Sequence, residues 1–297
     1  MPARLILNAD DFGLTRGINR AIAELHSAGA LTSATLMANG AAFDDAIRIA
    51  HAQPTLGLGC HIVLTDGIPI SPPETIPTLL GPDGRTFRRS LTDFFAAALL
   101  GRISEADIAR EALAQISRIQ LQGIEITHLD THKHTHILPR VARPLLAVAE
   151  RTGIRAIRNP FEPGWSSSIG VSPFFRRVQL RGLGYLKPLF FSLPQIRDGR
   201  VCTTDGTLGV SATGSLDATT LRAILNIIPN GTWELVCHPG YNDRDLDAVS
   251  TRLRATRDVE RAALLDAFFP TSSQQSHPPL PELINYKDVA QFATADR

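Results

Sequence analysis

The sequence predicts an α/β protein: a distorted, TIM-like (β/α) barrel of about seven parallel strands, in one domain over residues 1–297. Two observations predict this fold. Short apolar runs alternate with amphipathic segments of roughly ten or more residues, which is the pattern of βαβ units and a parallel sheet. Polar side chains gather where several apolar runs end, and α/β barrels carry their sites at the carboxyl ends of strands. Nothing comparable gathers at the strand starts.

Each apolar run is predicted as a strand and each amphipathic segment as a helix. The predicted strands cover residues 4–9, 31–38, 56–64, 124–129, 154–158 and 232–238. The predicted helices cover residues 16–28, 42–52, 90–100, 104–122, 139–151, 217–228 and 249–268. Two regions rich in proline and glycine, 65–89 and 161–213, are predicted as loops on the carboxyl rim, the second as an insertion or lid. Residues 270–281 are predicted to be a flexible spacer before a last element at 282–292.

The composition is that of a soluble globular protein, with 43% hydrophobic and 20% charged residues. Thirty Lys and Arg residues against 29 Asp and Glu give a net charge of +1, which excludes an overall field that attracts nucleic acid. Three scattered cysteines indicate a reducing compartment. The first residues lack the pattern of a signal peptide, and no run approaches the roughly 20 apolar residues of a membrane span. We therefore expect a cytoplasmic protein, and the sequence is compatible with either a monomer or a homo-oligomer.

The strongest functional signal is the stretch HLDTHKHTH, residues 128–136, which holds four of the nine histidines. His132, His134 and His136 alternate in it, and Asp130 lies nearby. Neutral imidazoles bind divalent ions, and adjacent carboxylates fix their tautomers. The stretch therefore predicts a metal site in which one or two of these histidines are ligands.

Three other predicted strands also end in polar residues. Asp10 and Asp11 follow the first strand, either as turn or cap residues or as a metal ligand beside a proton acceptor. His61 lies in another strand, and taken alone it is either a hydrogen-bonded core residue or a ligand. His238 ends a further strand. The cysteine that precedes each of these two histidines is predicted to be a small apolar packing residue.

Taken together, these motifs resemble the YdjC-like carbohydrate deacetylases, a family that includes the chitooligosaccharide deacetylases. The similar pieces occur in the family's order and are NADDFG (8–13), LTSATLMANG (31–40), GLGCHIVLTDG (57–67), THLDTHKHTH (127–136) and CHPG (237–240). The long loop after His61 and the segment IRAIRNPFEP (154–163) resemble the branch linked to hopanoid biosynthesis. That branch removes acetyl from an N-acetylglucosaminyl hopanoid.

The resemblance implies a metal-dependent N-deacetylation. By position, Asp11, His61 and His132 are the implied ligands of one divalent ion, Zn²⁺ or Mg²⁺. Asp10 is the implied general base and His238 the implied general acid. This set suits amide hydrolysis, because a metal ion polarises the carbonyl and activates water, while a protonated group is needed for the amine to leave.

Four more residues are placed by the resemblance behind the ligands or in the sugar pocket: Asp130, His134, His136 and Arg158. Lys133 departs from the family, where His or Asn is frequent at this position. The departure matters little if residues 132–136 are extended, because the Lys133 side chain then points away from the metal.

The implied substrate is an acetylated amino sugar, linked to a lipid in the hopanoid branch. Residues 172–194 mix aromatic and basic side chains, which is typical either of a peripheral contact with the inner membrane face or of an ordinary amphipathic helix packed on the barrel. A soluble chitooligosaccharide deacetylase and a non-catalytic metal-dependent sugar- or lipid-binding protein are the main alternatives. An amidohydrolase-type barrel, whose His-x-His pair usually follows the first strand, and a phosphoester hydrolase fit less well.

Overall fold

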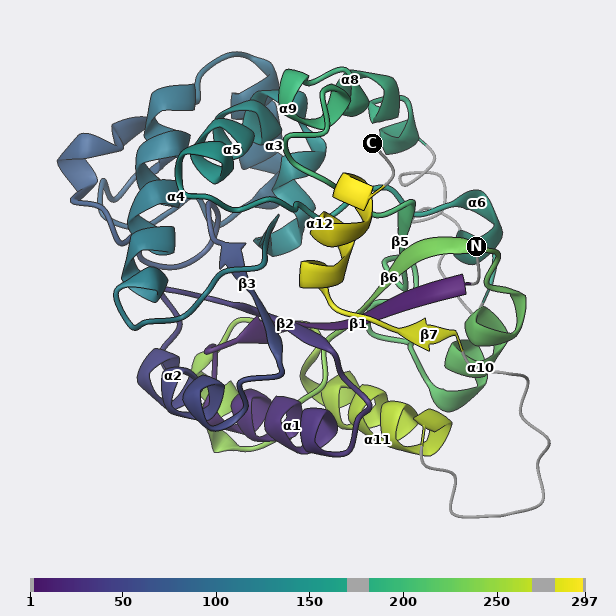
Figure 1. The fold of residues 1–297 in the computed structure, drawn as a ribbon. Helices are drawn as coiled ribbons and strands as arrows, with labels where there is room; N and C mark the ends of the chain where they lie inside the picture. Colours follow the sequence, from purple (N-terminus) through teal and green to yellow (C-terminus); the bar gives the residue numbers. More distant parts are fainter. Residues whose placement is uncertain (1–2, 170–181, 269–280, 296–297) are drawn as a thin grey trace, which may run out of the picture.

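The computed structural model describes residues 3–169, 182–268 and 281–295. Their centre is a curled, all-parallel sheet that forms a half-barrel, as predicted (Figure 1). Its strands are ordered β4-β3-β2-β1-β6-β5, and β7 pairs with β1 beside this path. The strands are β1 Ala3–Phe12, β2 Ser33–Leu36, β3 Gly57–Ile62, β4 His128–Thr131, β5 Gly206–Leu208, β6 Gly231–Cys237 and β7 Glu282–Leu283.

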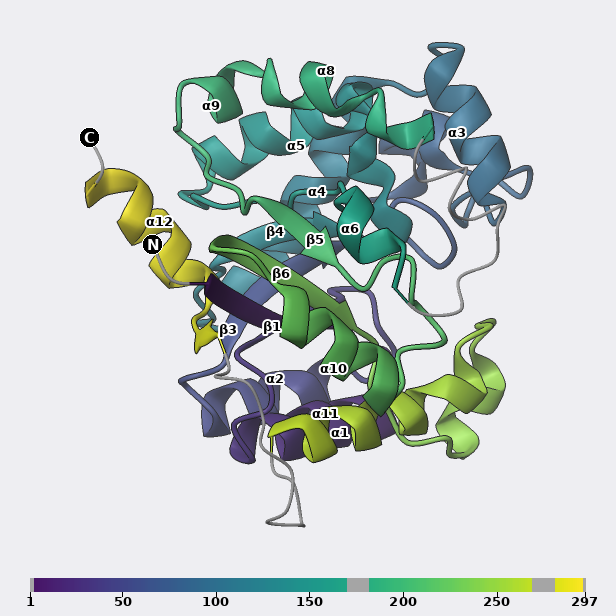
Figure 2. The ribbon, with the colours of Figure 1, turned by 90° about the vertical axis from the view of Figure 1, so that its right-hand side faces the viewer.

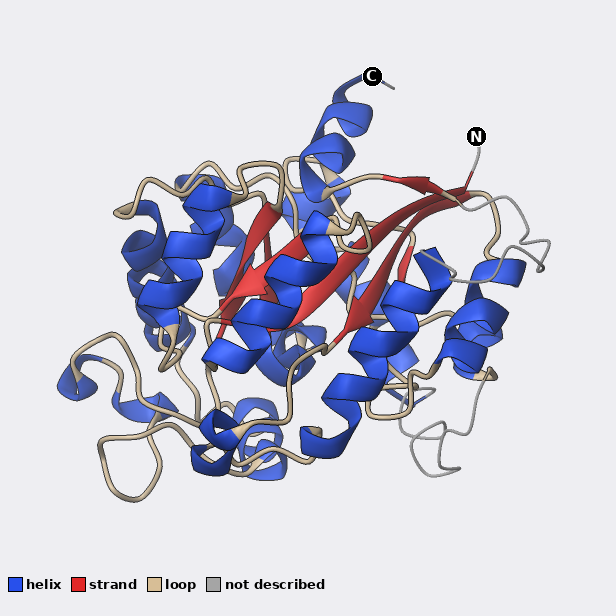
Figure 3. Cartoon of the chain, turned by 90° about the horizontal axis from the view of Figure 1, so that it is seen from below, coloured by secondary structure: helices blue, strands red, loops and turns tan. Residues whose placement is uncertain are grey.

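Helices cover the outside of the curled sheet (Figures 1 and 3). Helices α1, α2 and α11 lie together along one side, and α4, α5, α8 and α9 lie on the other (Figure 2). The helices are α1 Arg16–Ser27, α2 Phe43–Ala52, α3 Leu91–Leu99, α4 Glu105–Gln120, α5 Pro139–Arg151, α6 Gly164–Ser167, α8 Lys187–Phe191, α9 Pro194–Arg197, α10 Ala218–Ile227, α11 Arg257–Phe268 and α12 Tyr286–Ala295. Short 3-10 turns are η1 Pro73–Thr75, η2 Pro77–Leu79, η3 His132–Ile137, η4 Arg244–Ala248 and η5 Arg254–Thr256.

The two faces of β1 show how the sequence separates core from site. Leu5 and Leu7 belong to the main hydrophobic core and are fully buried. Burial of a leucine side chain stabilises the fold by roughly 1.5–3 kcal/mol. The alternate residues Ile6, Asn8 and Asp10 lie on the other face of the strand, and the last of them reaches the polar centre. One strand thus contributes an apolar outer face and a partly polar inner face.

The C-terminal segment closes the amino-terminal end of the half-barrel. Strand β7 pairs with β1 at Arg4 and Leu5, ahead of the point where β2 begins its pairing at Asn8. Helix α12 follows directly, next to the start of β1 (Figure 2). Its first residue, Tyr286, is fully buried in a small second core with Ile6, Ala156, Ile284 and Val289.

Three predicted strand boundaries are wrong in informative ways. Strand β4 begins at His128 rather than at residue 124, because its pairing with β3 begins at that residue. Residues 154–158 form isolated bridges, at Ala156 and Ile157, instead of a continuous strand. The segment 161–213, predicted as loop, contains β5, a three-residue strand too short to give a periodic signal.

The last predicted helix, 249–268, begins only at Arg257. Two 3-10 turns, η4 and η5, occupy the preceding segment. Thr251 contributes to this, because its side-chain oxygen accepts a hydrogen bond from the backbone N–H of Leu253 and so offers the chain a local alternative to a helix.

The remaining predictions concern segments that are only partly described. Residues 172–181 of the aromatic and basic stretch, and 270–280 of the predicted spacer, lie outside the described residues. Within the rest of that stretch, Phe190 is buried and packs edge-to-face on Phe161 and Phe191. Tyr185 and Leu189 are exposed, at 87% and 53%. Among the described residues, no helix is both long and apolar enough to cross a membrane.

Candidate metal and catalytic site

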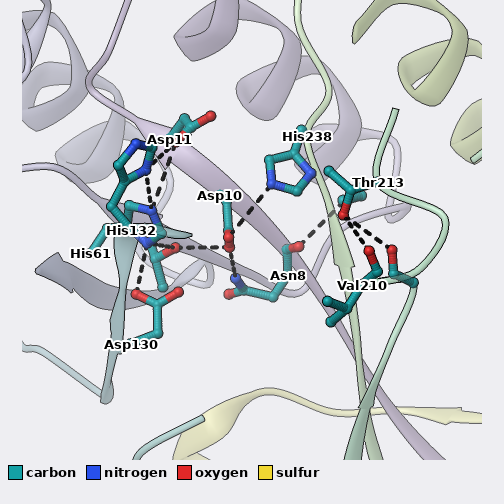
Figure 4. A network of polar contacts seen from close by, with 12 residues as sticks. Asn8, Asp10, Asp11, His61, Asp130, His132, Val210, Thr213 and His238 are labelled. Carbon is teal, nitrogen blue, oxygen red and sulfur yellow. Dashed lines mark hydrogen bonds and ion pairs between the residues drawn. The ribbon is translucent and has the colours of Figure 1, made fainter. Parts of the chain in front are cut away.

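Most of the predicted site residues meet at the carboxyl ends of four strands (Figure 4). Parallel pairing places His61 of β3 opposite Asp130 of β4. It also places Ala9 of β1 opposite Cys237 of β6, so that the next residues, Asp10 and His238, become neighbours. In Figure 4, Asp10 lies between the His61–Asp130 pair and His238.

A distortion at the end of β1 directs Asp10 and Asp11 toward different partners. The pairing register with β2 shifts between Ala9 and Phe12, and Asp11 has a φ of 67°. Left-handed backbone is uncommon outside glycine and is often found at functional sites. As a result, Asp11 approaches the two histidines His61 and His132, whereas Asp10 faces a different set of groups.

Asp11, His61 and His132 form a group that can hold a metal ion. The Oδ1 atom of Asp11 lies 3.7 Å from Nε2 of His61 and 3.6 Å from Nδ1 of His132. The two nitrogens are 3.3 Å apart. Ligand atoms around a tetrahedral ion with bonds of about 2.0–2.1 Å lie roughly 3.3 Å from one another. The three residues therefore fit a divalent ion with little rearrangement.

A second group of potential ligands, Asp10, His61 and Asp130, is less suited to a cation. Both of its carboxylates already contact the guanidinium of Arg158. A metal ion at this place would lie against that fixed positive charge, which repels it. His61 takes part in both groups, but its Nδ1 is held by Asp130 at 2.8 Å, which leaves Nε2 for an ion beside Asp11.

Arg158 is fully buried and lies at the centre of the polar network. It donates from Nη1 and Nη2 to the two oxygens of Asp10, at 3.0 and 2.7 Å. It donates from Nε and Nη2 to Oε1 of Glu234, at 2.9 and 2.7 Å, and forms an ion pair with Asp130. Burial alone would raise the pKa of Asp10, but the Arg158 charge, with His61 and His238, holds that pKa well below its usual range. Asp10 is therefore ionised at neutral pH.

The buried charges of the site are unbalanced. Five carboxyl groups and two guanidinium groups are buried within it: Asp10, Asp11, Asp130, Glu234, Glu260, Arg158 and Arg257. Uncompensated buried charge is costly, so part of this excess is removed by protonation. Burial raises the pKa of Glu260 to about 7. Burial by itself would lower the pKa of His61, but Asp130 and Asp10 raise it to about 9. A divalent cation at Asp11, His61 and His132 would offset the same excess and displace the His61 proton.

Arg257, at the start of α11, fixes the side of Asp11 that faces away from the histidines. Its Nη2 donates to Oδ2 of Asp11 at 2.6 Å, and its Nη1 donates to the backbone oxygen of His238 at 3.4 Å. Burial opposes ionisation of Asp11, but Arg257 and His132 hold its pKa well below the usual range. Oδ1 of Asp11 therefore stays charged and available to an ion.

His238 lies on the other side of Asp10. Its Nε2 is 3.7 Å from Oδ2 of Asp10, and its Nδ1 is 3.9 Å from Oε2 of Glu260. Burial lowers the pKa of His238 to about 4, although Asp10 and Asp11 oppose the shift. The imidazole is therefore neutral at pH 7, so it carries no proton of its own to give as the implied general acid.

The histidine-rich segment is a turn and not an extended strand. Residues His132–Ile137 form η3, and Lys133 and His134 have left-handed backbone. The predicted alternation of facing sides therefore does not hold. His132 reaches the ligand group, and His136 is buried between the hydroxyl of Thr131, at 2.7 Å, and the backbone oxygen of Arg158, at 3.2 Å. His136 is thus part of the site's support.

Two more side chains of this turn, His134 and Lys133, lie apart from the ligand group. His134 has lost solvent contact at Nδ1, which has no hydrogen-bond partner among the described residues. Burial, with the Arg158 charge next, holds the pKa of His134 well below its usual range, so the ring is neutral. Lys133 points to the rim, where it forms an ion pair of 3.3 Å with Asp66.

Four functional neighbours were missed from the sequence: Glu234, Arg257, Glu260 and Tyr286. A signal existed for Glu234, because a charged residue inside the apolar strand TWELVC needs a buried partner. Arg257, Glu260 and Tyr286 lie in helices where polar residues are ordinary, so nothing in the local pattern distinguishes them.

Comparisons with known proteins show the family of this chain. The family model described as YdjC-like protein matches residues 4–275. The chain therefore belongs to the YdjC-like family. A carbohydrate deacetylase of Geobacillus stearothermophilus is 34% identical over 268 residues, which cover 89% of this chain and 90% of that protein. A carbohydrate deacetylase of Brevibacillus brevis is 42% identical over 147 residues, where the alignment spans about half of each chain, 50% of this one and 56% of the relative.

The fold is shared with a solved structure from Enterococcus faecalis V583, of a protein named for cellobiose-phosphate cleavage. The two chains superpose with a TM-score of 0.72 at 23% identity, over 97% of this chain and 99% of the other. At this identity the likeness concerns the fold alone.

The buried state of His136 predicts how stability depends on pH. Burial, then the Arg158 charge, lowers its folded pKa from 6.5 to about 3. Between these values the unfolded chain binds a proton that the folded chain does not, so this stability is complete above about pH 6.5 and is lost as the pH falls. At pH 4.5 this one group lowers the free energy of unfolding by roughly 2–3 kcal/mol.

Urea unfolding of EDTA-treated protein between pH 7 and 4.5 measures this effect. We expect His136→Gln to lose stability less steeply than the wild type, by about one bound proton. The matched control is His51→Gln, at an exposed position of α2, which should keep the wild-type slope. Identical slopes for wild type and His136→Gln would show that His136 is not the buried neutral group.

Proposed function

We propose that this carbohydrate deacetylase hydrolyses the acetamide of an N-acetylglucosamine-type sugar with one divalent ion held by Asp11, His61 and His132. The observation that carries the proposal is the pair of groups beside these ligands. Asp10 is a second buried carboxylate, adjacent in sequence but held away from the ligand group, and His238 lies 3.7 Å from it. Binding alone has no need of this extra carboxylate and imidazole.

Two imidazoles and a carboxylate suit Zn²⁺ better than Mg²⁺, which prefers oxygen ligands and retains waters. When bound, such an ion polarises an acetamide carbonyl and makes water a nucleophile at neutral pH. The protein's part is to keep Asp11 charged through Arg257 and to present Nε2 of His61 through Asp130.

Asp10 and His238 have complementary tasks in this account. Ionised Asp10 takes a proton from the attacking water, and Arg158 fixes the orientation of both of its oxygens. As the water oxygen bonds to the acetyl carbon and the C–N bond breaks, the amine must gain a proton. Both residues are proton acceptors at neutral pH. The proton that Asp10 takes from the water therefore passes to His238, whose Nε2 lies 3.7 Å from Oδ2 of Asp10, and from there to the amine.

Two substitutions separate these roles. Asp10→Asn keeps the size of the side chain and leaves the ligand group, so it should bind the metal with wild-type stoichiometry and lose activity by about 10²–10⁴-fold. His132→Ala removes a ligand, so it should lose both metal and activity. Metal content by elemental analysis and acetate release by an enzymatic assay measure the two effects. Substantial turnover in either variant would refute the assignment.

For the substrate, we propose a lipid-linked amino sugar, an N-acetylglucosaminyl hopanoid. The resemblance of the segment 154–163 to the hopanoid branch supports it, as do exposed Tyr185 and Leu189, which flank the basic residue Lys187. These features would make a peripheral contact with a membrane.

A soluble chitooligosaccharide is the second candidate. It is favoured by an Enterobacter relative named chitooligosaccharide deacetylase. That relative is 37% identical over 155 residues, which cover 52% of this chain and 58% of that protein.

Acetate release from N-acetylglucosaminyl bacteriohopanetetrol and from diacetylchitobiose decides between them. We expect release from the hopanoid that stops with EDTA and returns with added Zn²⁺. Release from diacetylchitobiose alone would keep the reaction and replace the lipid by a soluble sugar. Release that is unaffected by EDTA would remove the metal from the account, and no release from either sugar would favour a non-catalytic binding protein.

A further inference from the structure

A chain of buried polar contacts connects the C-terminal helix to Asp10. The hydroxyl of Tyr286 donates to Oε2 of Glu234. Oε1 of the same carboxylate accepts from Nε and Nη2 of Arg158, at 2.9 and 2.7 Å. Arg158 in turn holds both oxygens of Asp10 and contacts Asp130, which orients His61. Every residue in this series of contacts is buried.

We propose that Tyr286 is a positioning residue of the deacetylase site, which acts through Glu234 and Arg158 on Asp10 and Asp130. The inference rests on the proposed role of Asp10 in catalysis. It adds a residue from a part of the chain that the family model does not reach, since that match ends at residue 275.

The geometry explains why one hydroxyl matters. Arg158 faces three carboxylates, and its Nη2 is shared between Asp10 and Glu234, at 2.7 Å from each. The plane of the guanidinium therefore depends on how the Glu234 carboxylate is turned. Oε2 of Glu234 is held by Tyr286 and, at a long 3.4 Å, by the hydroxyl of Thr207. Without the Tyr286 hydroxyl, Oε2 of Glu234 keeps only the weaker contact, with Thr207. The Glu234 carboxylate then no longer holds Arg158 in a fixed orientation.

The position of Tyr286 is itself well determined. Its ring stacks on the imidazole of His128 in β4, with centroids 3.7 Å apart and planes 13° apart. A Cβ atom at Gly59 would lie 2.5 Å from this imidazole, so Gly59 leaves the space that His128 occupies. Burial, with Arg158 next, holds the pKa of His128 well below its usual range, so the stacked ring is neutral. The ring of Tyr286 is thus held by packing, in a position from which its hydroxyl donates to Glu234.

Tyr286→Phe tests the proposal, because it removes the hydroxyl and leaves the stacked ring. We expect kcat to fall about tenfold, the effect of losing a hydrogen bond to a charged group, with KM and metal content unchanged. Glu234→Gln should reduce kcat further. The double variant should be no slower than Glu234→Gln alone, because both changes act through the same carboxylate.

Tyr241→Phe is the matched control. Its hydroxyl also donates to a glutamate, Glu24, at 2.6 Å, but near the surface and outside the polar network of the site. It should keep the wild-type kcat.

Each other outcome overturns the inference. A wild-type kcat for Tyr286→Phe, additive losses in the double variant, or a rise in KM alone would each show that Tyr286 does not act through Glu234. A Tyr286→Phe variant that fails to fold would assign the hydroxyl to stability instead. If the wild type releases no acetate from either sugar, the proposed function is what fails, and the inference falls with it.

Discussion

The guanidinium of Arg158 is the contact on which the rest of the site depends. It is fully buried and satisfies carboxylates from three different strands: Asp10, Asp130 and Glu234. Removing one partner of a buried ion pair leaves the others uncompensated and costs about 3–5 kcal/mol. Strands β1 and β6, which are neighbours, and β4, which lies beyond β2 and β3 in the sheet, are therefore tied together at the point where the chemistry is proposed.

Around this contact the buried carboxylates belong to two centres, Arg158 and the group that can hold a metal ion. Arg158 takes Asp10 and Asp130, while Asp11, His61 and His132 on the other side remain for a metal ion. His61 belongs to both centres, since Nδ1 meets Asp130 and Nε2 faces Asp11. This division keeps Asp10 out of the ligand group and leaves it as an ionised acceptor. It also makes the hold on Asp130 a condition for the orientation of His61.

The sequence was sufficient for the fold class and for the family, and less so for the details of the site. Apolar runs that end in polar residues predicted the parallel sheet and the edge where Asp10, Asp11 and His61 meet, because parallel strands deliver their carboxyl ends together. The 128–136 stretch predicted a ligand but not its geometry. Alternation implies an extended chain, whereas the left-handed Lys133 and His134 turn the segment and leave His132 at the ligand group.

The sequence could not predict the contacts that elements far along the chain make with the site. Arg257 and Tyr286 are more than 240 residues from the N-terminal aspartates, and each lies in a segment of the sequence where polar residues are ordinary. Their contacts with Asp11 and Glu234 arise only when α11 and α12 pack on the half-barrel.

The most direct test of the central claim is an anomalous-scattering map from crystals of the zinc-loaded protein, collected at the zinc edge. We expect one peak at about 2.0–2.2 Å from Oδ1 of Asp11, Nε2 of His61 and Nδ1 of His132. Arg158 should keep its contacts with Asp10 in that structure. A peak between Asp10 and Asp130, or zinc bound elsewhere with this group empty, would contradict the division of charge on which the proposed mechanism depends.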